Sequence, residues 1–230
     1  MPTRERSERF ILVEDHGLVA EALRHTLTAA GHHVVLVGPD DATSEQVVAA
    51  AGAARATVVL DLDLGRGADG RRRLGWTLIE PLVTAGHRVM VLTGDLEAAR
   101  WGRCVSLGAV GVVTKALPLQ DVAELAVAAA RGEPVMSPAA RQEVLRSWDS
   151  QRVSKERLQA PLRRLTRRES QVLAHLVDGH SAATIAATSI VSEATVRSQI
   201  RAILDKLGVV SQLQAVAAAR RAGWSWPPAA

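Results

Sequence analysis

Four short apolar runs in the first half of the chain each end in side chains that could do chemistry. In chain order, these side chains are Glu14 and Asp15, Asp61, Thr93, and Lys115. An apolar run of this length, ending abruptly in a polar residue, predicts a buried strand. Because the carboxyl ends of parallel strands open on one edge of a sheet, we expect the five side chains to converge there.

The chemistry that this set supports is phosphoryl transfer. The carboxylates of Glu14, Asp15 and Asp61 can hold a hard divalent cation, which we expect to be Mg²⁺. Asp61 is then the nucleophile that becomes an aspartyl phosphate. Lys115 would balance charge on the phosphoryl oxygens, and Thr93 would donate its hydroxyl to one of them.

Each residue also has a simpler interpretation when it is taken alone. An aspartate after a strand often only stabilises a turn, which applies to Asp61. Glu14 and Asp15 could cap the helix expected to begin near Leu18, and Lys115 could be a surface charge. The ordered set of all five residues is what predicts a phosphoacceptor site.

This pattern resembles the receiver domain of two-component response regulators, over residues 10–131. The resemblance implies a doubly wound, five-stranded parallel sheet of the flavodoxin type, with helices on both faces. It also implies that a sensor histidine kinase phosphorylates Asp61, and that the backbone carbonyl of Asp63 is a further metal ligand.

The second half of the chain predicts four short helices. Thr166 and Glu169 have the spacing of a capping box, followed by apolar residues at helical spacing up to Gly179. Further helices are expected over residues 181–188, 192–207 and 211–222. A short helix, a tight connection and a longer helix form the helix-turn-helix plan, whose second helix enters the DNA major groove.

The amino-acid sequence of residues 165–223 is similar to that of the LuxR-type, or NarL/FixJ-type, DNA-binding domain. The pieces that carry the similarity are Leu165-Thr166, Arg168-Glu169, Val172-Leu173, Thr195-Val196 and Lys206-Leu207-Gly208-Val209. The resemblance implies that Arg197, Ser198 and Arg201 read base edges. It also implies that Thr195, Gln199 and Lys206 contact phosphates, although an ordinary solvated helix face would carry the same arginines.

Charge supports a division into an acidic and a basic part. The net charge is −3 over residues 1–130, +2 over residues 131–160 and +5 over residues 161–230. We therefore predict a receiver domain at 1–131, a proline-containing and charged linker at 132–161, and a small all-α DNA-binding domain at 162–230. Within the linker, residues 137–148 have a weak apolar face that is compatible with a helix.

The sequence departs from the receiver pattern at several positions. Gly65 stands where a proline usually follows the phosphorylated aspartate, and Val112 stands where an aromatic switch residue is common. About six extra residues before Gly75 include Arg66, Arg71, Arg72 and Arg73. These arginines could lie in a solvated loop, or contact the phosphoryl group, a partner or an acid on another subunit. In the second half, Ala182 and Gln199 replace residues that the family often has as Asn and His.

Other features narrow the classes of protein and site. A single cysteine, Cys104, excludes an internal disulfide and a cysteine zinc cluster. The seven scattered histidines are expected to be surface or strand-edge residues rather than metal ligands. The charged N-terminus does not resemble a signal peptide, and no apolar run reaches the roughly 18 residues of a membrane span. We therefore expect a cytoplasmic protein that does not contact membranes and is not an enzyme.

The sequence predicts a transcription regulator in which phosphorylation of Asp61 controls dimerisation and binding to promoter DNA, with RNA polymerase as a further candidate partner. One alternative is a receiver-type transcription factor that is regulated without phosphorylation. The other alternative is a signalling adaptor whose helical domain binds a protein. The ordered pocket residues argue against the first alternative, and the basic face formed by Arg197 and Arg201 argues against the second.

Overall fold

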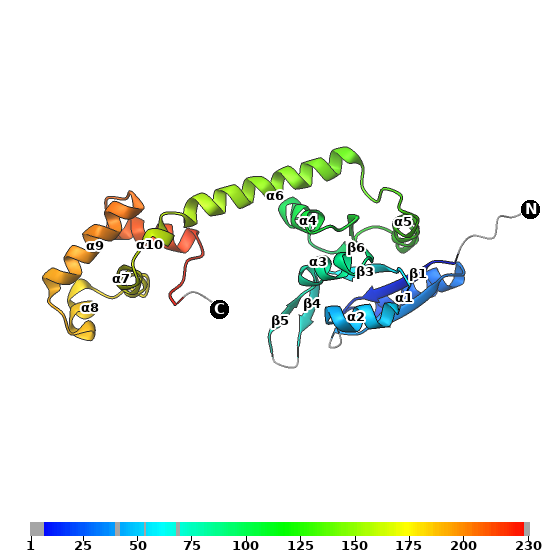
Figure 1. The fold of residues 1–230 in the computed structure, drawn as a ribbon, viewed down its shortest axis with the longest axis horizontal. Coiled ribbons are helices and arrows are strands. Elements are labelled where there is room, and N and C mark those ends of the chain that lie inside the picture. The colour runs from blue at the N-terminus through cyan, green and yellow to red at the C-terminus, as the bar shows by residue number, and fades with distance from the viewer. Residues whose placement is uncertain (1–6, 40–41, 53, 68–69, 228–230) are drawn as a thin grey trace, which may run out of the picture. The chain divides into compact units, whose positions relative to one another are not determined.

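A computed structural model describes residues 7–39, 42–52, 54–67 and 70–227 (Figure 1). The chain divides into two compact units, residues 1–149 and 150–230, which are described separately below. The domain limits expected from the sequence differ from this division, because the first unit extends into the segment expected to be a linker.

The first unit is built on a five-stranded parallel sheet. In chain order the strands are β1 (Arg9–Val13), β2 (His33–Val37), β3 (Thr57–Asp61), β6 (Arg88–Thr93) and β7 (Gly111–Thr114). Their order in the sheet is β2-β1-β3-β6-β7, and each neighbouring pair is parallel. The order reverses beside β1, so the predicted doubly wound α/β fold is confirmed, and the carboxyl ends of the strands lie along one edge.

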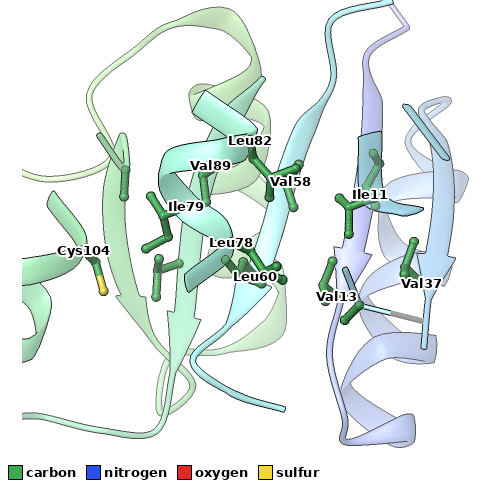
Figure 2. Packing of buried hydrophobic residues seen from close by; sticks show 14 of the residues in the cluster. Ile11, Val13, Val37, Val58, Leu60, Leu78, Ile79, Leu82, Val89 and Cys104 are labelled. Atoms are coloured by element: carbon green, nitrogen blue, oxygen red, sulfur yellow. The ribbon is translucent and has the colours of Figure 1, made fainter. Parts of the chain in front are cut away.

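Helices cover both faces of this sheet. They are α1 (Gly17–Ala29), α2 (Ser44–Ala51), α3 (Trp76–Thr84), α4 (Ala98–Ser106) and α5 (Leu119–Arg131). Successive strand residues point to opposite faces. Val58 and Leu60 therefore pack with Ile79 of α3 (Figure 2), whereas Val59 packs with residues of α1 and α5. Burial on both faces explains why the strands read as continuous apolar runs.

The extra residues between Asp61 and Gly75 form a β-hairpin. Its strands are β4 (Asp63–Arg66) and β5 (Arg72–Leu74), which are antiparallel, with Asp63 opposite Leu74. Figure 1 shows the hairpin between β3 and α3. The arginine-rich insertion is thus a β-hairpin that follows directly on the end of β3. Residues 68 and 69 lie outside the described residues.

The predicted linker contains the long helix α6 (Pro138–Gln159). Its first half belongs to the first unit, where Val144 is buried in the core. A side chain at Gly102 of α4 would place its Cβ 1.9 Å from the backbone oxygen of Val144. Glycine at position 102 therefore lets α4 and α6 approach each other closely.

The second unit is a small helical domain. Its helices are the 3-10 turn η2 (Leu162–Arg164), α7 (Arg167–Val177), α8 (Ala182–Ser189), α9 (Glu193–Leu207) and α10 (Gln212–Arg221). The predicted capping box is confirmed, because Thr166 N donates to Glu169 at 2.6 Å and Glu169 N donates to Thr166 Oγ1 at 3.3 Å. Leu173, Ile185 and Ile203 are buried in the shared core, which confirms the predicted four-helix plan.

No single helix of the described residues has the length and apolar character of a membrane span. Helices α9 and α10 reach that length and apolar character when they are taken together, but they are bent by 55° relative to each other.

Candidate functional site

The structure brings Glu14, Asp61 and Lys115 together at the carboxyl edge of the sheet. Lys115 follows β7, and its Nζ lies 2.7 Å from Asp61 Oδ2 and 2.7 Å from a carboxylate oxygen of Glu14. More than fifty residues separate Lys115 from Asp61 along the chain, and about a hundred separate it from Glu14. The parallel topology alone accounts for this convergence, as the sequence predicted.

Asp61 is buried at the end of β3, with only 3% of its surface exposed. Burial raises the pKa of Asp61 from 3.8 to about 6, even though the hydrogen bond from Lys115 acts in the opposite direction. The backbone N–H of Asp63 donates to Asp61 Oδ1 at 3.3 Å. At Gly75, a Cβ would lie 1.9 Å from the Asp61 backbone oxygen, so only glycine allows α3 to begin against this residue.

Lys115 is half-buried, and Asp61 and Glu14 stabilise its positive charge. Burial would lower the pKa of Lys115, but its hydrogen bonds with Asp61 and Glu14 outweigh burial, and the pKa is raised. Lys115 is therefore a fixed ammonium group at neutral pH. Such a group can bind an anion that arrives beside Asp61.

The acidic side chains suit a divalent cation. Glu14, Asp15, His16 and Asp61 each offer one donor atom, and these atoms lie within 4.8 Å of one another. Asp15 Oδ1 is buried and accepts no hydrogen bond of good geometry from the described residues, although His16 Nδ1 lies 2.7 Å from it. This anionic oxygen is therefore a candidate metal ligand. The predominantly carboxylate donor set fits a hard cation such as Mg²⁺.

His16 is a member of this cluster that sequence reasoning missed. Its Nδ1 lies 2.7 Å from Asp15 Oδ1 and 3.0 Å from Glu14 Oε1. The hydrogen bond with Glu14 is the main cause that raises the pKa of His16. The signal for it in the sequence was its position directly after Glu14 and Asp15. That position alone does not distinguish a member of the cluster from an exposed histidine.

A cavity of about 630 Å³ opens beside Asp61. Thr93 and Lys115 line this cavity together with Asp61, so the three side chains lie around one space. Thr93 is buried, and its Oγ1 accepts a hydrogen bond from Asp95 N at 3.1 Å. The cavity is large enough for a phosphoryl group and the end of its donor.

Residues of α3 and α4 that the sequence did not indicate form the far wall of the cavity. The guanidinium of Arg103 lies 3.3 Å from the centre of the Trp76 ring and 5.7 Å from that of Trp148 on α6. Arg103 and Trp76 line the cavity. These residues connect the space beside Asp61 to helix α6 through stacked side chains.

The hairpin arginines are held mainly by the hairpin and its surroundings. Arg72 Nε donates to Asp63 Oδ1 at 3.2 Å, and this partner holds the pKa of Asp63 below its usual range. Arg66 donates to the Gly70 carbonyl oxygen at 3.0 Å, and Arg73 donates to the Pro39 carbonyl oxygen. Of these arginines, Arg72 also lines the cavity.

In the second unit, α9 carries a polar exposed face and an apolar buried face. The exposed face contains Thr195, Arg197, Ser198 and Arg201, whereas Val196 and Ile200 are buried. Arg197 is paired with Glu193 at 2.6 Å, one turn earlier on the same helix. The structure therefore places four of the six predicted DNA-contacting residues on one accessible face.

The other two predicted contacts are less exposed. Gln199 is half-buried, and its Oε1 has no hydrogen-bond partner within the described part of the chain. Lys206 Nζ donates to both carboxylate oxygens of Glu169, at 2.6 and 2.8 Å. These bonds tie α9 to the capping box of α7 and favour a structural role for Lys206.

Comparisons with known proteins agree with both units. Residues 163–219 match the family described as bacterial regulatory proteins, luxR family. The transcriptional regulatory protein DegU of Brevibacillus brevis is 25% identical over 234 residues, covering 96% of each chain. LiaR of Bacillus subtilis, also a transcriptional regulatory protein, is 26% identical over 216 residues, covering 93% of this chain and 97% of LiaR.

Among solved structures, the response regulator ChrA of a heme-sensing two-component system is 30% identical to this chain, with a TM-score of 0.44. The alignment covers 94% of this chain and 97% of ChrA.

Proposed function

Since the chain belongs to the NarL/FixJ-type response regulators, which are DNA-binding transcriptional regulators, we propose that Asp61 accepts a phosphoryl group from a sensor histidine kinase. The carboxylate of Asp61 carries this proposal. It is buried, lies 2.7 Å from the ammonium of Lys115, and faces a cavity of about 630 Å³. A buried carboxylate beside a fixed cation is the arrangement that nucleophilic attack on a phosphoryl group requires.

In the proposed step, a carboxylate oxygen of Asp61 forms a bond to phosphorus. The bond between phosphorus and the kinase histidine nitrogen breaks, and that nitrogen takes up a proton. Glu14, Asp15 and Asp61, with the Asp63 carbonyl, would hold Mg²⁺, which supplies positive charge to the phosphoryl oxygens. Lys115 would exchange its bond to Asp61 for one to the phosphoryl group, while its bond to Glu14 keeps it in place.

The phosphoryl group would change contacts that lead to α4. It brings about −1.5 to −2 charges at neutral pH, and the Thr93 hydroxyl can donate to one of its oxygens. Thr93 is hydrogen-bonded to Asp95, whose carbonyl oxygen accepts from Trp101 Nε1 at 2.7 Å. A shift of Thr93 would therefore pull on the start of α4, and α4 packs closely on α6 at Gly102.

The proposed output is control of dimerisation and of promoter binding through α9. Arg197, Ser198 and Arg201 would face base edges, and Thr195 at the beginning of the helix would contact phosphate. A dimer would place two such helices on half-sites about one helical turn apart. The net charge of +5 over residues 161–230 supports binding to a polyanion.

Intact mass spectrometry tests the phosphorylation step. The full chain is incubated with acetyl phosphate and Mg²⁺, beside Asp61→Asn and, as a matched control, Asp63→Asn. One phosphoryl increment in the wild type and in Asp63→Asn, but not in Asp61→Asn, is the expected result. An equal increment in Asp61→Asn would assign phosphorylation to another residue. Absence of any increment in the folded wild type would favour control without phosphorylation.

A further inference from the structure

Two histidines and an aspartate meet at the end of α7. His175 lies in the last turn of this helix, Asp178 is its C-cap, and His180 follows two residues later. One donor atom from each residue lies within 4.8 Å of the other two. From the sequence, the histidines were expected to be surface or strand-edge residues rather than metal ligands, so this cluster is a feature that the sequence did not indicate.

The spacing of the two imidazole rings fits one shared ion. His175 Nδ1 and His180 Nδ1 lie 3.3 Å apart. Zinc–nitrogen bonds of about 2.0 to 2.1 Å in a tetrahedral site place neighbouring ligand atoms roughly 3.3 to 3.4 Å apart. The observed distance is therefore the distance that two histidine ligands of one zinc ion would have.

The backbone of the turn fixes the two rings next to each other. His180 N donates to the His175 carbonyl oxygen at 2.9 Å, and Gly179 N donates to the Leu176 carbonyl oxygen at 3.1 Å. Gly179 has a φ of +87°, a conformation that glycine adopts without strain. Binding of a metal would therefore need little reordering of the main chain.

The charge at this position favours a cation. The carboxyl end of a helix carries partial negative charge from its unpaired carbonyl groups, and the Asp178 carboxylate adds a full negative charge. The opposing group is Arg220, which donates to the Val177 carbonyl oxygen at 3.0 Å. In the described part of the chain, the Arg220 guanidinium is bonded to a carbonyl oxygen of the helix end and not to any of the three candidate ligands.

We propose that His175, Asp178 and His180 form a site for a divalent transition metal of the Zn²⁺ class, with water as a fourth ligand. Two imidazoles and one carboxylate prefer zinc, nickel or copper to Mg²⁺. The ion would join the end of α7 to His180, the residue before Ser181. The Ser181 side chain caps α8 by accepting from Thr184 N at 3.1 Å. Metal binding would thus stabilise the connection between α7 and the first helix of the helix-turn-helix.

Titration of Zn²⁺ into the full chain, in competition with a chromophoric zinc chelator, tests the proposal. Every sample carries Asp15→Asn and Asp61→Asn, so that these two carboxylates of the acidic cluster in the first unit do not bind Zn²⁺. His180→Gln removes one proposed ligand at an exposed position. His25→Gln, which removes an exposed histidine from α1, is the matched control.

The expected result is one Zn²⁺ equivalent on the background protein and on the His25→Gln variant. Because loss of an outer partner of a metal ligand already weakens affinity by about 10- to 100-fold, His180→Gln should weaken it by at least about tenfold. Zn²⁺ should also raise the melting temperature of the background protein and not that of His180→Gln. Absence of a zinc equivalent, or unchanged zinc affinity in His180→Gln, would overturn the proposal.

Discussion

Replacing Asp61 with asparagine should stabilise the metal-free protein at alkaline pH. Asp61 is buried, and burial raises its pKa from 3.8 to about 6. A shift of about two pKa units corresponds to a cost of roughly 2 to 3 kcal/mol for keeping the carboxylate ionised in the folded state. Asparagine has the same shape without the charge, and Lys115 keeps its bond to Glu14. The variant should therefore gain up to about 3 kcal/mol at pH 8.

The sign of this effect depends on pH in a defined way. Between about pH 4 and pH 6 the folded wild type binds more protons at Asp61 than the unfolded chain does, so its stability falls as the pH rises through this window. Above about pH 6 the folded wild type carries the full free-energy cost of an ionised Asp61. The advantage of Asp61→Asn should therefore be largest above pH 6 and disappear below about pH 4.

Differential scanning calorimetry in the presence of a chelator measures this difference. The transition of the first unit is followed at several pH values, because two compact units do not unfold as one two-state system. Glu80→Gln, which neutralises an exposed carboxylate on α3, is the control and should change little. If Asp61→Asn is no more stable than the wild type at pH 8, the claim that ionised Asp61 is destabilised by its burial in the folded protein is refuted.

Three further predictions concern other parts of the molecule. Arg201→Ala should weaken binding to a preferred duplex by about 1 to 3 kcal/mol and relax its sequence preference, as measured by fluorescence anisotropy; unchanged affinity and preference would remove Arg201 from the base-reading face. Glu169→Gln keeps the capping residue but loses the ion pair with Lys206, so it should destabilise the second unit at pH 7 by about 1.5 to 3 kcal/mol. The pKa of Glu169 is lowered, because its hydrogen bonds with Lys206 and Thr166 outweigh burial, so the loss relative to wild type in calorimetry should shrink as the pH falls below the ordinary glutamate range; a loss independent of pH would contradict the ion pair. Gly102→Ala should separate α6 from α4, because its Cβ would lie 1.9 Å from the Val144 oxygen, and amide exchange over residues 138–149 should accelerate, whereas Gly17→Ala, with no atom within 4 Å, should leave it unchanged.

The sequence predicted those parts of the site that depend on strand order. Glu14, Asp61, Thr93 and Lys115 each follow or end a recognisable apolar run, and the parallel sheet brings strand ends together whatever the loop lengths are. The capping residue Thr166 was also visible in the sequence, because capping depends on residues only three positions apart.

The sequence could not predict contacts that depend on how helices meet in space. Trp76, Arg103 and Trp148 come from three helices, and Trp148 comes within 5.7 Å of Arg103 because Gly102 lets α6 approach α4. The predicted role of Lys206 in phosphate binding depended on its position in α9, but its ammonium is bonded to Glu169 of α7. Periodicity identifies which face of a helix is polar and does not identify which neighbouring acid a long side chain reaches.

The most direct test of the account is the effect of phosphorylation on DNA affinity. Duplexes that bind the full chain are first selected from a random library at low salt, and the dissociation constant is then measured with and without acetyl phosphate and Mg²⁺. The account predicts a phosphorylation-dependent change in affinity in the wild type and none in Asp61→Asn, with both proteins losing affinity as salt rises. An equal affinity of phosphorylated and unphosphorylated wild type, with Asp61 shown by mass to be modified, would contradict the proposed control.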